Sequence, residues 1–338
     1  MTDLLLSIDW SVDPQAFTIL GRPIAWYGIL WATGVALTAY VVFRMFKHEK
    51  YKEEWFDSFF MHVVVALLIG ARLGHCLFYD PVEYLSNPLD LLKVWEGGLS
   101  SHGGAIGMLI GVCIFSLKQT KEPVKWKLLI AASAIGIAVG GIVHMLAPTD
   151  ASVSALDSSN LLLGRIFMGL FSGLCIALVY NSSPMSIKML DRLIVGVCIG
   201  ATSIRLGNLM NSEIFGKHTT LPWGFNFLNS RQWEMAGSLP CHPTQIYEAL
   251  VYFSLFLITM FLYWRTKAKE KTGLILGITL LGIFGSRILI ESIKFVQVEF
   301  EESMILNLGQ LLSLPFVLWA IYLIYNALKS NSKTQLNK

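Results

Sequence analysis

The sequence predicts an all-α polytopic membrane protein with nine spans. Of its 338 residues, 54% are hydrophobic and only 14% are charged, and the mean hydropathy is +0.58. Soluble domains carry about 25% charged residues, so this composition indicates an integral membrane protein. Nine apolar runs are long enough, or nearly so, to cross about 30 Å of hydrocarbon as helices. They cover residues 22–43, 56–79, 98–117, 127–148, 161–180, 190–210, 244–264, 273–293 and 305–327.

The basic residues between these runs predict which loops face the cytoplasm. One alternating set of loops carries 17 of the 26 Lys and Arg residues, and the other set carries five. Cytoplasmic loops are enriched in Lys and Arg, so we expect the N-terminus outside and the C-terminus in the cytoplasm. The sparse set consists of Arg22, Lys93, Lys217, Arg231 and Lys294.

The remaining sequence features define a single integral membrane domain over residues 1–338. Residues 211–243 form a long outer loop, and 328–338 form a polar cytoplasmic tail. The acidic N-terminus, residues 1–15, lacks a positively charged region, so no cleavable signal peptide is expected. The five cysteines define no disulfide framework. No zinc-protease or phosphate-loop motif occurs, and the basic residues form no nucleic-acid footprint, so we expect no metal, cofactor or nucleic acid.

Polar residues in or beside the apolar runs share one expected depth. The predicted orientation places them all near the outer face, whereas scattered structural ion pairs have no reason to share a depth. A charged side chain in hydrocarbon costs several kcal/mol, so such residues usually have a partner or a function. We therefore expect a functional site near the outer leaflet. The residues are Tyr27, Arg72, His102, Arg205, His242, Gln245, Glu248 and Arg287.

Two arginines in this set favour binding of an anion. Arg205 and Asn208 are three residues apart, and Arg287 and Glu291 are four apart, so each pair shares one face of a helix. The forked donors of arginine suit phosphate, and a phospholipid headgroup is the anion present at this depth. The alternatives are structural: Arg205 joining two helices through a carboxylate, and an intrahelical salt bridge at Arg287.

The stretch Gly97-Gly98-Leu99-Ser100-Ser101-His102-Gly103-Gly104 offers a general base. The pKa of histidine lies near neutral pH, so His102 could take up a proton. Ser100 or Ser101 could cap a helix whose free N–H groups favour an anion. The glycines could admit a ligand, or they could simply mark a close contact between helices.

The outer loop contains aromatic residues typical of a membrane–water interface. It could lie over the bilayer as a lid or substrate platform, or these residues could form an aromatic belt without another role. They are Trp223, Phe225, Phe227 and Trp233.

Taken together, these stretches resemble the bacterial prolipoprotein diacylglyceryl transferases. The family signature reads Gly-Arg-x-Gly-Asn-Phe-x-Asn-x-Glu-x-x-Gly, and residues 204–216 match it except for Ile204 and Leu209. Both departures are apolar, so they concern helix packing more than chemistry. Further family-like pieces are Trp26-Tyr27-Gly28, Gly70-Ala71-Arg72-Leu73-Gly74, Ser101-His102-Gly103-Gly104, His242-Pro243-Thr244-Gln245-Ile246-Tyr247-Glu248, and Arg287 with Glu291.

The resemblance covers residues 18–327 and implies a core of seven helices. This core comprises 18–119 and 186–327, and residues 120–185 are expected to be an inserted two-helix hairpin that preserves sidedness. The hairpin could be a packing element, a partner-docking surface or part of a lipid gate. Within it, we interpret His144 and Arg165 as a local polar contact.

The resemblance also implies an enzyme of the bacterial cytoplasmic (inner) membrane. The implied reaction moves the diacylglyceryl group of phosphatidylglycerol to the lipobox cysteine in a prolipoprotein signal peptide, forming a thioether and releasing glycerol phosphate. The alternative is a non-catalytic protein that binds or translocates phospholipids. The expected catalytic residues are His102, Arg205, Arg287 and Glu291. Phosphatidylglycerol is expected to contact Tyr27, Arg72, Arg205, Asn208, Glu213, Gly216 and Arg287, with outer-face support from His242, Gln245, Tyr247 and Glu248.

Overall fold

The computed structural model describes residues 7–78, 81–93, 98, 100–146, 155–181, 184–230, 239–295 and 308–336. Every apolar run predicted above lies largely on a helix. Seven described helices are long and apolar enough to cross a membrane, and two shorter apolar stretches occur at Trp126–Ile142 and Ser313–Lys329. The prediction of a helical multi-pass membrane protein is therefore confirmed, whereas the crossing of the membrane by all nine helices stays a prediction.

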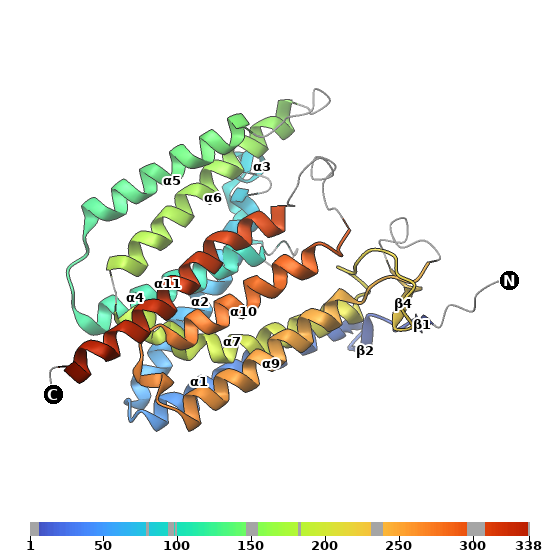
Figure 1. The fold of residues 1–338 in the computed structure, drawn as a ribbon. Helices are drawn as coiled ribbons and strands as arrows, with labels where there is room; N and C mark the ends of the chain where they lie inside the picture. The colour runs from blue at the N-terminus through green and yellow to red at the C-terminus, as the bar shows by residue number, and fades with distance from the viewer. Residues whose placement is uncertain are drawn as a thin grey trace. The chain divides into compact units, whose positions relative to one another are not determined.

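The chain forms two compact units, which are described separately (Figure 1). The first unit comprises residues 1–45 and 190–338, and the second comprises 46–189. Helix α1 (Trp26–His48) passes from the first unit into the second, and α7 (Met185–Met210) passes back.

Helices in the second unit pack closely through glycines. Helix α2 (Glu53–Phe78) lies against α4 (Ser101–Thr120), and α5 (Trp126–Leu146) lies against α6 (Ala155–Asn181). A Cβ atom on Gly103 would overlap the carbonyl oxygen of Gly70. Small residues let helix backbones approach each other in a membrane. Gly103 therefore supports the alternative in which these glycines mark a close contact between helices.

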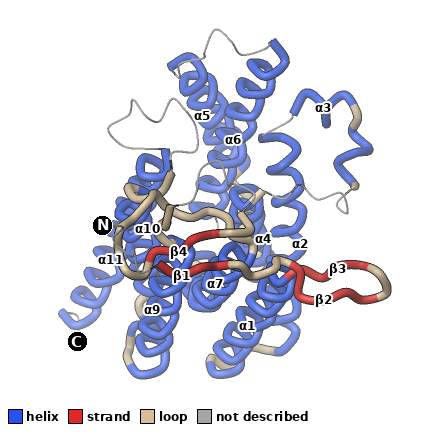
Figure 2. The backbone as a smooth tube through the Cα atoms, turned by 90° about the vertical axis from the view of Figure 1, so that its right-hand side faces the viewer, coloured by secondary structure: helices blue, strands red, loops and turns tan. Residues whose placement is uncertain are grey.

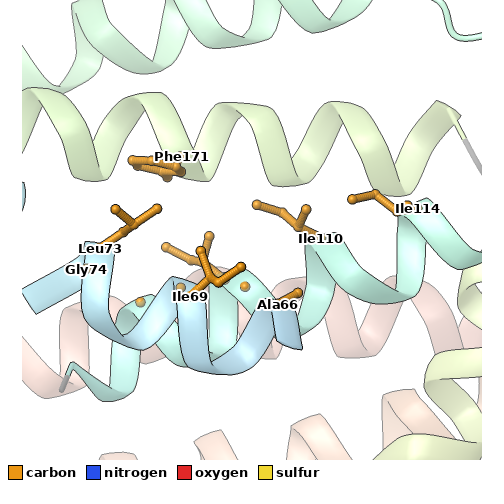
Figure 3. A pocket seen from close by; sticks show the side chains of 11 residues that line it. Ala66, Ile69, Leu73, Gly74, Ile110, Ile114 and Phe171 are labelled. Carbon is orange, nitrogen blue, oxygen red and sulfur yellow. The ribbon is translucent and has the colours of Figure 1, made fainter. Parts of the chain in front are cut away.

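An apolar cavity of about 230 Å³ lies between α2, α4 and α6 (Figure 3). Ile69 and Leu73 of α2, Ile110 of α4 and Phe171 of α6 line it, together with backbone at the glycine contacts. Phe171 belongs to the predicted hairpin, so this hairpin contributes one wall. Short elements α3 (Pro81–Ser86) and η1 (Pro88–Leu92) connect α2 to the segment before α4.

The polar contact predicted within the hairpin is confirmed. Nη1 of Arg165 on α6 lies 3.3 Å from Nδ1 of His144 on α5. The two helices are also joined by Gly136 and Gly169, whose backbones are in direct contact.

The first unit contains four further helical elements beside α1 and α7. These are α9 (Thr244–Arg265), η3 (Ala268–Glu270), α10 (Leu274–Glu291) and α11 (Leu308–Leu336). Helix α11 continues into the tail predicted at 328–338. The buried core of the first unit includes one side chain from each of its five long helices: Val41, Val195, Tyr263, Ile275 and Ala327. Between α1 and α7, the Thr38 hydroxyl donates to the Gly196 carbonyl at 2.8 Å.

Short strands at one end of this unit were absent from the all-α prediction. Strand β1 (Ser7–Trp10) pairs in parallel with β4 (Gly224–Phe227), and β2 (Gln15–Ile19) forms a hairpin with β3 (Arg22–Ala25) (Figure 2). The β1–β4 pair joins segments more than 200 residues apart, so local sequence patterns give no sign of it.

The outer loop builds a small apolar core rather than only an aromatic belt. Phe225 and Phe227 are 7% and 2% exposed and pack with Leu209, Phe215 and Cys241. These two rings therefore face the interior of the protein, and the position of the loop at the membrane stays a prediction. Trp223 is exposed, and Trp233 lies outside the described residues.

A buried aspartate caps α10 from a neighbouring helix. Asp191 on α7 accepts hydrogen bonds from the Gly273 N–H at 2.6 Å and from the Leu276 N–H at 2.8 Å. The first N–H groups of a helix lack partners within it, so this carboxylate satisfies two of them. It thereby fixes α10 to α7 at the end opposite the strands.

We expect Asp191→Ala to lower the free energy of unfolding by about 2 kcal/mol, because the capping bonds are buried and charge-assisted. Thermal unfolding of purified protein in detergent measures this loss. Asp191→Asn keeps an oxygen acceptor, so its free energy of unfolding should fall less than that of Asp191→Ala. Equal midpoints for wild type and the alanine variant would show that the cap contributes nothing.

Candidate active site

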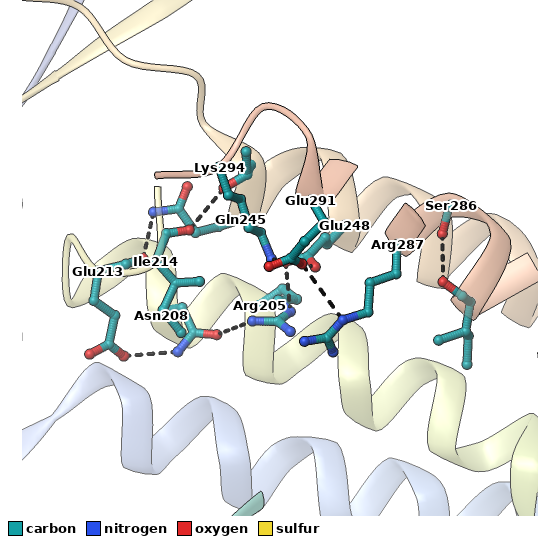
Figure 4. A network of polar contacts seen from close by, with 12 residues as sticks. Arg205, Asn208, Glu213, Ile214, Gln245, Glu248, Ser286, Arg287, Glu291 and Lys294 are labelled. Atoms are coloured by element: carbon teal, nitrogen blue, oxygen red, sulfur yellow. Dashed lines mark hydrogen bonds and ion pairs between the residues drawn. The ribbon is translucent and has the colours of Figure 1, made fainter. Parts of the chain in front are cut away.

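Five charged residues of the first unit meet near one end of its helices. Arg205 lies in the last turns of α7, Glu248 in the second turn of α9, and Arg287 and Glu291 in the last turns of α10. Lys294 follows α10 directly. We call these five residues the arginine cluster (Figure 4).

Arg205 pairs with a carboxylate on another helix. Its Nε lies 3.0 Å from Oε2 of Glu248, which is 1% exposed, and its Nη1 donates to Oδ1 of Asn208 at 3.2 Å. The second contact confirms that Arg205 and Asn208 share one face of α7. The contact with Glu248 is the helix-joining ion pair considered above as the structural alternative.

The signature residues continue this network away from Arg205. Nδ2 of Asn208 donates to Oε1 of Glu213 at 2.8 Å, and Asn211 donates to the same oxygen at 3.2 Å. The backbone bends sharply here, because Ser212 and Ile214 have φ values of 50° and 60°. Such left-handed backbone is uncommon for residues other than glycine. Glu213 thus reaches Arg205 through Asn208 rather than directly.

Residues of α9 hold this bend in place. Gln245 donates to the Glu213 carbonyl at 2.7 Å, and the Thr244 hydroxyl donates to the Ile214 carbonyl at 2.8 Å. Gly216 fits tightly beside them, since a Cβ atom there would lie 2.6 Å from the Ile293 carbonyl oxygen. Gly216 therefore has a packing reason to be glycine, apart from any contact with a lipid.

Arg287 is the more accessible arginine. Its side chain is 33% exposed, and its Nε lies 3.7 Å from Oε2 of Glu291. The predicted pairing along α10 therefore occurs, but it is looser than the Arg205–Glu248 pair. Within the part of the chain that the structure describes, the two terminal nitrogens of Arg287 donate no hydrogen bond. They are available to an anion.

Lys294 is the member of the cluster that sequence reasoning missed. It was counted among outer-loop residues, yet its side chain is 5% exposed and lies 3.0 Å from Glu248 and 3.5 Å from Glu291. The available signal was its spacing, three residues after Glu291. The cluster thus holds three cations and two carboxylates, which gives it a net charge of +1.

Tyr27, at the start of α1, packs against the signature backbone. A Cβ atom on Gly207 would lie 2.8 Å from Cδ2 of Tyr27. A larger residue than glycine at position 207 would displace the ring. Tyr27 therefore lies beside the turn of α7 that carries Arg205.

Two of the predicted support residues form a chain of hydrogen bonds. The Trp223 indole N–H donates to the Tyr247 hydroxyl at 2.9 Å, and this hydroxyl lies 3.2 Å from Nδ1 of His242. Burial lowers the pKa of His242, which favours a neutral ring that accepts the hydroxyl proton at Nδ1. This chain ties the outer loop to α9.

Arg72 and His102 belong to the second unit. Arg72 is 5% exposed, and its guanidinium donates to the backbone carbonyls of Asp90, Leu91 and Gly98. Ser100 caps α4 by accepting the Gly103 N–H at 3.3 Å, as the sequence suggested. His102 lies in the first turn of α4, and its side chain is outside the described residues.

Cys241, which packs with Leu209 and Phe215 of the signature, is not activated. Like Cys76, Cys113 and Cys198, it is buried. Burial raises the pKa of Cys241 to about 11, so this thiol stays protonated at neutral pH. A thiol must ionise to act as a nucleophile.

Known proteins match the chain over nearly its whole length. The family model for prolipoprotein diacylglyceryl transferase matches residues 14–148 and 155–326. A phosphatidylglycerol–prolipoprotein diacylglyceryl transferase of Porphyromonas gingivalis is 41% identical over 332 residues, which is 96% of this chain and 95% of that protein.

Two more distant relatives carry the same name. The protein of Bacteroides fragilis is 34% identical over 337 residues, covering 96% of this chain and 97% of its own length. The protein of Chloroherpeton thalassium is 31% identical over 331 residues, covering 98% and 97%. With the signature residues gathered around Arg205, these matches establish that the chain belongs to the prolipoprotein diacylglyceryl transferase family.

Proposed function

We propose that this protein transfers the diacylglyceryl group of phosphatidylglycerol to a prolipoprotein, with the arginine cluster binding the phosphate. The relatives carry this activity in their names. The observation that supports the phosphate site is a net positive cluster containing one partly exposed arginine, Arg287, whose terminal nitrogens are available as donors. The acceptor is the lipobox cysteine at the signal peptide of the prolipoprotein.

The reaction forms one bond and breaks one bond. The cysteine sulfur loses its proton and bonds to the glyceryl carbon, while the bond between that carbon and the phosphate oxygen breaks. The products are a thioether and glycerol phosphate. Because the nucleophile belongs to the substrate, the protonated state of Cys241 is compatible with this reaction.

The arginines stabilise charge that grows during the reaction. The phosphate of phosphatidylglycerol carries one negative charge as a diester, and it gains a second as the carbon–oxygen bond breaks. Fixed cations aimed at developing charge lower the barrier most in a site that excludes water. In this proposal Arg205 and Arg287 bind the phosphate, Asn208, Tyr27 and Glu213 orient it, and Glu291 positions Arg287.

His102 is proposed to accept the proton of the cysteine thiol. His102→Gln should lower kcat/KM about 100-fold and change its dependence on pH, because general-base catalysis commonly contributes that much. A variant whose pH–rate profile matches the wild type would exclude His102 as the base.

The proposed arrangement in the membrane has nine spans, with the N-terminus outside and the active site near the outer leaflet of the bacterial inner membrane. The basic loops support this orientation. The positions of Tyr27, Arg205, Glu248 and Arg287 at one end of their helices agree with a shared depth. Within one membrane domain, residues 18–119 and 186–327 form the core, and 120–185 add a hairpin. Residues 211–243 lie outside, and 328–338 lie in the cytoplasm.

A transfer assay tests the proposed function. The purified protein is incubated with phosphatidylglycerol and a lipobox peptide, and the mobility of the peptide is followed. A shift that requires the peptide cysteine supports transfer, and a Cys→Ser peptide is the matched control. Binding of phosphatidylglycerol without modification of the peptide would instead support the non-catalytic alternative.

A further inference from the structure

Lys294 connects the two carboxylates that hold the arginines. Its Nζ lies 3.0 Å from Oε1 of Glu248 and 3.5 Å from Oε2 of Glu291. Glu248 in turn pairs with Arg205, and Glu291 pairs with Arg287. A single buried ammonium group is thus shared by the partners of both arginines.

The lysine is held in place by its backbone as well as by its charge. Residue 294 forms an antiparallel bridge with Gly216, at the end of the signature. Next to it, the Lys217 N–H donates to the Ile293 carbonyl at 2.7 Å. The signature turn therefore fixes where Lys294 enters the cluster.

Lys294 lies away from the side of the cluster on which the arginines could bind an anion. Figure 4 shows Lys294 approaching the carboxylates from one side and both guanidinium groups lying on the other. Lys294 is 5% exposed, compared with 33% for the Arg287 side chain. A lysine in this position acts on the arginines through the carboxylates rather than by touching a substrate.

We propose that Lys294 is a positioning residue that keeps Arg205 and Arg287 available to phosphate, an inference that rests on the proposed function. Without it, two carboxylates face two arginines, and the net charge of the cluster falls from +1 to zero. Each arginine is then drawn more fully into its own ion pair. The anion site loses positive charge although both guanidinium groups remain.

Two readouts distinguish this role from simple packing. Loss of one positive charge weakens binding of the anionic lipid more than it slows turnover of the bound lipid, so the KM should change more than the kcat. Arginine at position 294 keeps the charge and should restore binding, whereas a purely steric role would not be restored by this larger side chain.

The test compares Lys294→Met with wild type and with Lys217→Met. Lys217 is an exposed lysine near Lys294 that donates to the Ser292 carbonyl at 3.1 Å, so it controls for loss of one positive charge. We expect Lys294→Met to raise the KM for phosphatidylglycerol about tenfold, equivalent to about 1.4 kcal/mol, whereas the kcat changes less. Lys217→Met should behave like wild type.

Two results would overturn the inference. One is a Lys294→Met enzyme whose KM equals that of wild type, and the other is a folded Lys294→Arg enzyme whose KM is raised as much as that of Lys294→Met. If Lys294→Met does not fold, Lys294→Arg decides, because it keeps the charge and should keep the KM within about twofold. A folded Lys294→Arg with a KM raised more than about tenfold would contradict the role.

These outcomes differ from failure of the proposed function. Absence of peptide modification by wild-type protein would remove the transferase proposal itself. Wild-type transfer combined with an unchanged KM in Lys294→Met, or with no rescue by Lys294→Arg, would remove only the positioning role.

Discussion

Arg287→Lys is expected to lower kcat/KM for diacylglyceryl transfer about 100-fold while the protein stays folded. Lysine keeps the positive charge but replaces two terminal nitrogens in a fixed plane by one ammonium group. Arg287 is 33% exposed, and its Nε, not its terminal nitrogens, approaches Glu291. The substitution therefore removes the donors that are free to bind phosphate.

The matched control is Arg265→Lys, the same substitution at an exposed residue at the far end of α9. We expect wild-type activity from it and similar thermal midpoints for both variants. The transfer assay with a lipobox peptide measures the activities. Equal transfer by Arg287→Lys and wild type would show that the paired terminal nitrogens of Arg287 take no part in the reaction.

Glu248→Gln is expected to lower the free energy of unfolding by about 3 kcal/mol and to reduce transfer severely. The carboxylate is 1% exposed and lies 3.0 Å from both Arg205 and Lys294. Removing one partner of a buried ion pair leaves an uncompensated charge, and here two cations lose one anion. Glutamine has nearly the same shape, so the effect isolates the charge.

Thermal unfolding in detergent and the transfer assay measure these two effects. Glu270→Gln provides the control, because Glu270 is an exposed glutamate near the opposite end of the same helix. A Glu248→Gln variant as stable and active as the Glu270→Gln variant would mean that the Arg205–Glu248 contact is energetically unimportant.

The helices could be predicted from the sequence because the membrane imposes a local rule. A segment that crosses hydrocarbon must satisfy its backbone internally and present apolar side chains, so each helix is visible in its own residues. The strands could not be predicted in this way. Pairing between β1 and β4 depends on segments such as Ser7 and Gly224 that are remote in sequence.

The candidate site was predictable where its contacts are local. The Arg205–Asn208 and Arg287–Glu291 contacts follow from helical spacing. The sequence left open a carboxylate that joins Arg205 to another helix, but helical spacing could not identify it as Glu248, because the two residues meet only through tertiary packing. Lys294 was missed because it follows the end of an apolar run and therefore reads as a loop residue.

The expected role of Arg72 also depended on contacts that helical spacing does not show. Its expected depth grouped it with the other arginines, but sequence position cannot reveal that its donors satisfy backbone carbonyls of η1. A buried backbone carbonyl needs a hydrogen-bond donor, and an arginine can supply several. The proposed contact of Arg72 with lipid therefore has less support than the contacts of Arg205 and Arg287.

The central claim, that Arg205 and Arg287 bind the phosphate of the lipid, is tested most directly by comparing two ligands. Phosphatidylglycerol and diacylglycerol share their acyl chains but differ in the phosphate, and native mass spectrometry measures how well each is retained. We expect wild type to prefer phosphatidylglycerol, and each of Arg205→Gln and Arg287→Gln to reduce that preference about tenfold, since a hydrogen bond between charged groups contributes about 1.5 kcal/mol or more. An unchanged preference in both folded variants would contradict the account.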